Sequence, residues 1–164
     1  MTIFRWISGA RPTDLQVRQV YGFCFDERGR VLLRVDGEDY GLPGGRPERG
    51  EDATATLARE CMEESQIEIA RPLYFGYLRV TDDGGPPYAQ LRMAARITAF
   101  LPRHPDPDTG RTYRRLLVPL YKAPALLGWG TDGLLQAAGA VHAAELLGIN
   151  PDAAHDEVWR DEAI

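Results

Sequence analysis

The chain has 164 residues, of which 44% are hydrophobic and 26% are charged, and its formal net charge at pH 7 is −5. This balance is typical of a globular protein and excludes the disordered and fibrous classes. The negative charge argues against general binding of nucleic acid or of anionic membrane surfaces. We expect one compact domain over residues 1–164, with an N-terminal arm at 1–16 and a C-terminal tail at 150–164.

The expected location follows from two kinds of segment that the sequence lacks. No stretch approaches the roughly 18 consecutive apolar residues that predict a membrane span. Residues 1–10 lack the basic start and long apolar core of a signal peptide. A cytoplasmic location without membrane association is therefore expected. The two cysteines, Cys24 and Cys61, fit no zinc spacing, and we expect buried, reduced thiols.

The first half of the chain predicts strands that lead into a helix. Apolar, β-branched and aromatic residues at 17–25 and 31–35 predict two strands joined by a hairpin at 26–30. A short extended stretch at 40–43 then leads into a pair of glycines. A helix from Glu51 to about Ser65 follows. Its expected apolar side consists of Leu57, Ala58, Cys61 and Met62.

The second half predicts further strands and one long helix. Strands are expected at 73–80 and 88–101, separated by an Asp/Gly/Pro-rich turn, and the second strand alternates apolar residues from Leu91 to Ala99. After a Pro/Asp/Gly-rich loop at 103–111, residues 114–120 return as a strand or enter the last helical region. Thr131 is expected to cap a helix that runs to about Leu147 and stops at Gly148. Its predicted buried side consists of Leu134, Leu135, Ala138, Val141 and Leu146.

The helix predicted at 51–65 carries its glutamates on one side. A rotation of about 100° per residue places Glu60, Glu63 and Glu64 on one arc, because residues at i+3 and i+4 share a helix face. A merely solvated helix would scatter its charges. Carboxylate oxygens are the ligands that Mg²⁺ prefers. The spacing therefore predicts an acidic edge that faces a cleft and holds a divalent metal ion.

The segment from Gly45 to Ile67 reads GRPERGEDATATLARECMEESQI. It resembles the Nudix box, G-x5-E-x7-R-E-U-x-E-E-x-G-U with U a bulky aliphatic residue, and the preceding Leu-Pro-Gly-Gly at 42–45 resembles the family's lead-in. Two positions depart from the motif: Cys61 replaces an aliphatic residue, and Gln66 replaces glycine. A left-handed residue after a helix costs a residue with a side chain roughly 1 kcal/mol. Gln66 therefore predicts a reshaped helix end. The matching positions are Gly45, Glu51, Arg59, Glu60, Glu63, Glu64 and Ile67.

The resemblance implies the Nudix fold, an α/β (α+β) architecture with a mixed β-sheet between α-helices, over about Val17 to Gly148. It also implies that residues 1–164 form a Nudix-type pyrophosphohydrolase, acting on acid anhydrides with Mg²⁺, or Mn²⁺, as cofactor. Such an enzyme cleaves a diphosphate linkage by attack of a metal-activated water. We expect a small-molecule substrate, a nucleoside diphosphate linked to another group. The sequence leaves open whether the enzyme is a homodimer.

By the same resemblance, Glu60 and Glu64 are the strongest ligand candidates, and Glu63 is either a ligand or an outer contact. Glu60 or Glu63 could act as the base, although family members place the base differently, sometimes on a later loop. Arg59 is expected to orient a carboxylate such as Glu51. The implied metal ligands are the Gly45 carbonyl and the carboxylates of Glu60, Glu63 and Glu64. The implied catalytic residues are Glu60, Glu63, Glu64, Arg59 and Glu51.

Arg34, Tyr113 and Arg114 are the candidate substrate-binding residues. Arg34 ends a predicted strand just before the glycine pair, where it can meet a phosphate, although a surface arginine fits the pattern equally well. Tyr113 can stack on a base while Arg114 holds a phosphate, and an exposed strand edge is the alternative. The loop at 103–115 is expected to close over the substrate, and Asp106 or Asp108 to approach the metal.

Other functions have less support in the sequence. A Nudix-like nucleotide-binding or regulatory module without turnover remains the alternative, and the intact Arg-Glu-x-x-Glu-Glu core argues against it. An isoprenoid-diphosphate isomerase would require an extra catalytic cysteine in a longer chain, and neither Cys24 nor Cys61 is expected to be exposed. Ser8 and Ser65 are the only serines, and neither lies in a G-x-S-x-G turn. The sequence also lacks the phosphate-binding loop of P-loop NTPases.

Overall fold

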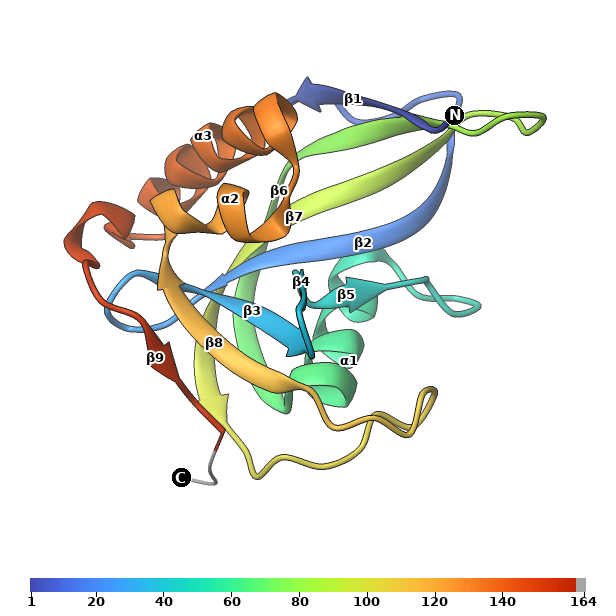
Figure 1. Cartoon of the computed structure of the whole chain (residues 1–164). Coiled ribbons are helices and arrows are strands. Elements are labelled where there is room, and N and C mark those ends of the chain that lie inside the picture. Colours follow the sequence, from blue (N-terminus) through green and yellow to red (C-terminus); the bar gives the residue numbers. More distant parts are fainter. Residues whose placement is uncertain (162–164) are drawn as a thin grey trace.

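A computed structural model describes residues 1–161. One mixed β-sheet runs through the molecule, with helix α1 on one face and helices α2 and α3 on the other (Figure 1). The helices are α1 (Ala53–Ser65), α2 (Ala123–Leu127) and α3 (Gly130–Leu146), and short 3-10 turns lie at Leu120–Lys122 and Pro151–Ala153. The strands are β1 (Ile3–Ser8), β2 (Gln16–Phe25), β3 (Arg30–Asp36), β4 (Asp39–Gly41), β5 (Gly44–Gly45), β6 (Ile67–Thr81), β7 (Tyr88–Phe100), β8 (Arg114–Pro119) and β9 (Val158–Trp159).

Within residues 1–161 the strand order is β1-β6-β7-β2-β3-β8-β9, with β4 paired to β3 and β5 paired to β2. Strands β2 and β7 run parallel, whereas the other pairs are antiparallel. This arrangement confirms the predicted mixed sheet between helices. The sequence left open whether residues 114–120 form a strand or enter a helical region; they form a strand followed by a 3-10 turn.

The sheet buries apolar side chains on both faces. Successive residues of a strand point to opposite faces, so Phe23 and Phe25 of β2 pack on the α3 side, whereas Cys24 packs on the α1 side. The alternation predicted for β7 holds in the same way, because Leu91 and Met93 belong to the core beneath α1. Two cores therefore fix the positions of the helices relative to the sheet.

Helix α1 begins at Ala53, after Asp52 caps it by accepting a hydrogen bond from the Ala55 N–H at 2.8 Å. Leu57 and Cys61 are fully buried, as the sequence predicts. Ala58, predicted on the same apolar side, is instead exposed, because the sheet covers a narrower stripe of this short helix. The thiols of Cys61 and Cys24 are buried, as the sequence predicts, and lie 3.7 Å apart as free cysteines.

Residue Gln66 ends α1 in the left-handed conformation, with φ 48° and ψ 48°. Its side chain offsets part of the backbone cost, because Nε2 donates to the Glu63 carbonyl at 2.8 Å. The neighbouring Ser65 carbonyl accepts a hydrogen bond from Arg115 Nη1 at 3.2 Å. The helix end predicted to be reshaped thus keeps the left-handed geometry of a glycine cap and adds side-chain contacts.

Both terminal segments contain more structure than the sequence indicated. The segment predicted as an arm contains β1, which pairs antiparallel with β6 at the edge of the sheet. In the predicted tail, β9 pairs with β8, and Pro151 is buried. The tail lies close against the β2–β3 turn: a Cβ at Gly29 would come within 2.3 Å of the Asn150 carbonyl oxygen. The last three residues of the predicted tail, 162–164, lie outside the described residues.

Two predictions for helix α3 are wrong. Trp129, not Thr131, occupies the N-cap position, and it makes no side-chain capping bond. The leucines expected to be buried are exposed, with relative exposures of 63% for Leu134, 50% for Leu135 and 66% for Leu146. The helix packs on the sheet through small residues, because a Cβ at Gly139 would lie 2.9 Å from Phe75. Of the residues the structure describes, none belongs to a helix both long and apolar enough to cross a membrane.

Candidate active site

The glycine pair before α1 brings backbone close to the acidic helix edge. Gly44 has φ +153°, and a Cβ there would lie 2.1 Å from the Val20 carbonyl oxygen, so this position requires glycine. A Cβ at Gly45 would lie 2.4 Å from Glu60 Oε1. The Gly44 N–H donates to Glu64 Oε1 at 2.8 Å. The two glycines thus form a tight cradle for the carboxylates of Glu60 and Glu64.

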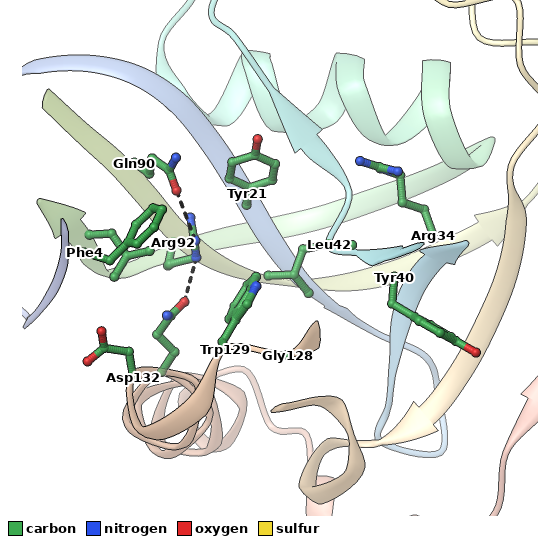
Figure 2. Close-up of a pocket in the computed structure, with 13 residues that line it drawn as sticks. Phe4, Tyr21, Arg34, Tyr40, Leu42, Gln90, Arg92, Gly128, Trp129 and Asp132 are labelled. Atoms are coloured by element: carbon green, nitrogen blue, oxygen red, sulfur yellow. Dashed lines mark hydrogen bonds between the residues drawn. The ribbon is translucent and has the colours of Figure 1, made fainter. Parts of the chain in front are cut away.

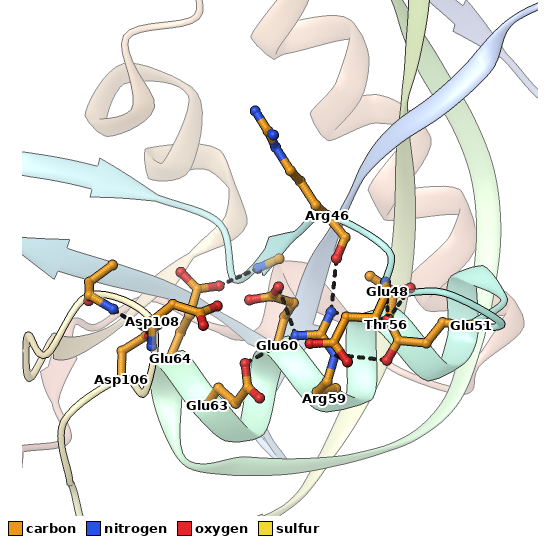
Figure 3. Close-up of polar contacts among 12 residues, drawn as sticks. Arg46, Glu48, Glu51, Thr56, Arg59, Glu60, Glu63, Glu64, Asp106 and Asp108 are labelled. Atoms are coloured by element: carbon orange, nitrogen blue, oxygen red, sulfur yellow. Dashed lines mark hydrogen bonds and ion pairs between the residues drawn. The ribbon is translucent and has the colours of Figure 1, made fainter.

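Arg59 is the centre of the carboxylate cluster (Figure 3). Its guanidinium binds Glu51 through two bonds, Nε to Oε2 at 2.7 Å and Nη2 to Oε1 at 3.1 Å. Nη1 contacts Glu60 Oε1 at 3.1 Å and Glu63 Oε2 at 3.0 Å. The expected pairing of Arg59 with Glu51 is therefore present, and the same arginine fixes the rotamers of two further glutamates.

The hydrogen bond from Arg59 holds the pKa of Glu51 at about 2, well below its ordinary value of 4.5. The carboxylate also accepts a hydrogen bond from the Glu48 N–H at 2.7 Å. Reciprocally, the bond to Glu51 raises the pKa of Arg59. Glu51 thus stays ionised across the physiological range, which suits a positioning role for this pair.

Glu64 is the carboxylate of the cluster whose pKa lies near neutrality. It is 6% exposed, and burial raises its pKa from 4.5 to about 7 despite the opposing effects of the Gly44 N–H and the Arg34 charge. Arg34 Nε lies 2.8 Å from Glu64 Oε2, but its N–H is not aligned for a hydrogen bond, so the contact is an ion pair. A carboxylate that titrates near neutral pH in a cleft is a functional-site candidate.

Glu60 and Glu63 differ in their surroundings. Glu60 is 8% exposed, and burial raises its pKa, with the Arg59 contact acting in the opposite direction. The Glu63 side chain is 25% exposed and lies at the outer edge of the cluster, where Arg59 is its partner. The three predicted glutamates therefore lie on one side of α1, with Glu60 and Glu64 buried and Glu63 at the outer edge.

The cluster has the ligand types of a divalent-metal site, but its carboxylates do not converge on one point. Among residues 1–161, no three carboxylate, imidazole or thiol groups converge closely enough to hold a metal ion. The carboxylates are instead turned toward Arg59 and Arg34. The donor set still fits a hard cation, since it consists of carboxylates and a close-approaching Gly45 backbone.

The loop between β7 and β8 lies beside this cluster (Figure 3). Its Asp106 is 5% exposed, and its charge contributes to the raised pKa of both Glu60 and Glu64. Asp106 Oδ1 accepts hydrogen bonds from the Asp108 and Thr109 N–H groups, which folds the loop tightly. Asp106 therefore lies within electrostatic reach of the predicted ligands.

The predicted substrate-binding residues are brought together only in part. The Tyr113 ring is buried and lies 4.9 Å from the Arg34 guanidinium, which in turn contacts Glu64. Arg114 is held at β9 instead: its Nη2 binds Asp161 at 2.9 Å, and its guanidinium stacks 3.9 Å from Trp159. Arg34 and Tyr113 thus belong to the cluster, whereas the side chain of Arg114 has other partners.

A pocket of about 430 Å³ adjoins the cluster at Arg34 (Figure 2). It lies on the α3 side of the sheet, and its walls include Tyr21, Arg92 and Trp129. The sequence analysis did not find these residues. The only signal was that Arg92 interrupts the apolar run of β7, in the phase opposite to Leu91 and Met93. The lining residues include Tyr21, Arg34, Arg92, Trp129, Asp132 and Gln136.

Comparison with known proteins decides the family. The family model described as NUDIX domain matches residues 15–113 of the 164-residue chain. The chain belongs to the NUDIX domain family. This match confirms that the segment at 45–67 is a Nudix box, and the protein is a Nudix hydrolase. The family generally uses divalent metal ions. A search of curated proteins found no match.

Solved structures confirm the fold of this Nudix hydrolase. A NUDIX hydrolase from Nitrosomonas europaea aligns with TM-score 0.56 and 22% identity, over 80% of this chain and 90% of that one. A MutT structure, from work on Aliivibrio salmonicida and Vibrio cholerae, aligns with TM-score 0.52 and 18% identity, over 74% and 94%. A variant of the Bacillus subtilis pyrophosphohydrolase BsRppH aligns with TM-score 0.52 and 22% identity, over 58% of this chain and 60% of that one.

Proposed function

We propose that this Nudix hydrolase is metal-dependent and cleaves the diphosphate linkage of a nucleoside diphosphate joined to another group. The observation that carries the proposal is the position of Arg34. Its guanidinium contacts Glu64 on one side and lines the pocket on the other. A diphosphate bound there would meet the acidic edge of α1 while its attached group enters the pocket. One structural neighbour is named a pyrophosphohydrolase, which agrees with this class of reaction.

The proposed roles follow from burial and contacts. Arg34 can hold a phosphate oxygen, because its side chain is 27% exposed and its guanidinium is already oriented by the Tyr113 ring. Arg59, anchored by Glu51, positions Glu60 and Glu63. Glu60 or Glu63 is proposed to accept the proton lost by the attacking water, since both carboxylates are held by Arg59 at the acidic edge of α1.

The proposed metal ligands are Glu60, Glu64 and the Gly45 carbonyl, with Glu63 as an outer contact. Bound there, Mg²⁺ or Mn²⁺ would offset phosphate charge and acidify a water molecule. Glu64 must be ionised to act as a ligand, and its pKa of about 7 means that binding releases a proton at or below neutral pH. Affinity for the metal is therefore expected to rise as the pH increases through 7.

The decisive experiment is a screen of nucleoside diphosphate derivatives with Mg²⁺ or Mn²⁺, followed by detection of phosphate after coupling to a phosphatase. Thermal melts with and without millimolar metal form the companion measurement, because a ligand that binds only the folded state raises the melting temperature. Turnover that requires metal supports the proposal. Nucleotide binding without any turnover would instead identify a binding module. An unchanged melting temperature, together with no heat of binding, would refute the metal site.

A further inference from the structure

The pocket beside Arg34 contains a buried cation whose hydrogen-bond partners are all neutral. Arg92 is 2% exposed, and burial lowers its pKa from 12.5 to about 10, so it remains charged at neutral pH. Nε donates to Gln136 Oε1 at 2.8 Å, Nη1 to the Leu91 carbonyl at 3.3 Å, and Nη2 to Gln90 Oε1 at 3.4 Å. No acidic side chain within residues 1–161 forms an ion pair with it.

The pocket wall does not neutralise this charge either. Among the described residues that line the pocket, Asp132 has the only carboxylate. Figure 2 shows it directed away from the Arg92 guanidinium. The lowered pKa of Arg92 reflects burial, opposed by Tyr21, with no contribution from Asp132. A buried charge without a counter-ion costs free energy, and an anion in the pocket would offset this cost.

The N–H groups around Arg92 are not all paired. A guanidinium has five N–H donors, and the three bonds to Gln136, Leu91 and Gln90 leave one N–H on each terminal nitrogen. The Gln90 amide is used on both sides, because its Nε2 donates to Gln19. The Gln136 amide is oriented by its bond from Arg92, and within residues 1–161 its Nε2 donates to no acceptor. These unpaired N–H groups favour an occupant that accepts hydrogen bonds.

Arg92 lies apart from the place proposed for the diphosphate. Figure 2 shows Arg92 and Arg34 at opposite sides of the pocket, with Tyr21 and Leu42 between them. The rings of Tyr21 and Trp129 each have their centroid 5.0 Å from the Arg92 guanidinium, which holds its plane before any ligand binds. The volume of about 430 Å³ leaves room for a small ligand that reaches both arginines. An anion at Arg92 would therefore be a different group from the diphosphate at Arg34.

We propose that Arg92 and Gln136 form a binding site for an anionic group, a phosphate or a carboxylate, that the substrate carries in addition to its diphosphate linkage. Arg92 supplies the positive charge, and Gln136 Nε2 supplies a neutral donor beside it. A substrate whose attached group is neutral would leave the buried cation without a counter-ion. This inference rests on the proposed function, because it describes the group that is joined to the diphosphate.

The test compares ligands that differ by one anionic group. Coenzyme A and dephospho-coenzyme A differ by a phosphate, whereas UDP-glucuronate and UDP-glucose differ by a carboxylate. Calorimetry measures their binding to the full chain in the presence of a chelator, which prevents metal-dependent turnover. In at least one pair the charged member should bind at least about tenfold more tightly, because it adds a charge-assisted hydrogen bond. The pair that shows this ratio identifies the site as one for phosphate or for carboxylate.

Gln136→Glu is the decisive variant, because it gives Arg92 the carboxylate that it lacks while nearly keeping the shape of the side chain. It should bring the affinity ratio close to one. Gln16→Glu, at an exposed position of β2, makes the same change of charge and should leave the ratio unchanged. Arg34→Met should weaken the binding of both members of a pair and keep the ratio, since it removes the charge at the other side of the pocket.

If Gln136→Glu does not fold, Arg92→Met decides, and it too should bring the ratio close to one. Equal affinity within both pairs, no binding of any ligand, or a full ratio in Gln136→Glu would overturn the inference. Turnover without preference for the charged member of a pair refutes only this inference. Anion-selective binding without turnover of any diphosphate derivative refutes only the proposed function.

Discussion

Replacing Glu64 by glutamine should stabilise the metal-free protein and abolish its activity. The rise of the Glu64 pKa from 4.5 to about 7 is caused mainly by burial. At about 1.4 kcal/mol per pH unit, keeping this carboxylate charged in the folded protein costs about 3 kcal/mol. Glutamine removes the charge, keeps the shape and can still accept from the Gly44 N–H. The free energy of unfolding should therefore increase by up to about 3 kcal/mol above pH 7.

The pH dependence makes this prediction specific. Because its pKa is raised in the folded state, Glu64 makes the parent lose stability as the pH rises from 4.5 to about 7. The advantage of Glu64→Gln should thus be near zero below about pH 4.5 and complete above about pH 7. Urea unfolding with a chelator at several pH values measures it, with the exposed Glu68→Gln as control. A pH-independent advantage, or a variant less stable than the parent at high pH, would refute the argument. Turnover should fall about a hundredfold or more.

The remaining predictions concern other residues of the site. Glu60→Gln should lower turnover about a hundredfold or more with an unchanged circular dichroism spectrum, and a variant that keeps about half the parent rate would show a structural role. Tyr113→Ala should raise KM, because its ring orients Arg34, by an amount worth on the order of 1–3 kcal/mol; Arg114→Ala should raise it less, since Asp161 holds that side chain. An equal KM for both variants would contradict this ranking. Gln66→Gly should be about 1 kcal/mol more stable to urea than Gln66→Ala, because only alanine pays for the left-handed backbone; equal stabilities would contradict it.

The acidic edge could be predicted from the sequence because helical spacing is a local property. Once residues 53–65 are helical, Glu60, Glu63 and Glu64 must share one side, whatever the rest of the chain does. The same holds for Gln66, whose position after the helix determines its left-handed backbone. The burial of β7 was also predictable, because its apolar residues alternate with a period of two along consecutive positions.

The pocket could not be predicted in this way, since its residues come from segments far apart in the sequence. Arg92 of β7 meets Gln136 of α3 across 44 positions, and no local pattern connects them. The prediction of the buried side of α3 was wrong for a related reason. Hydrophobicity favoured Leu134 and Leu146 as the buried side, but close packing on Phe75 admits only small residues such as Gly139.

In the proposed function, Arg34 links the two faces of the sheet into one site. It lies on β3 opposite Gly41 of β4, where a Cβ would come within 3.3 Å of the guanidinium carbon. The small residue leaves the guanidinium room to lie between Glu64, which belongs to the α1 face, and the pocket that contains Arg92 on the α3 face. The phosphate chain of a bound substrate would therefore lie across the end of the sheet. In this proposed arrangement the cleaved linkage lies on the α1 side and the group attached to the diphosphate lies on the α3 side, and one arginine connects them.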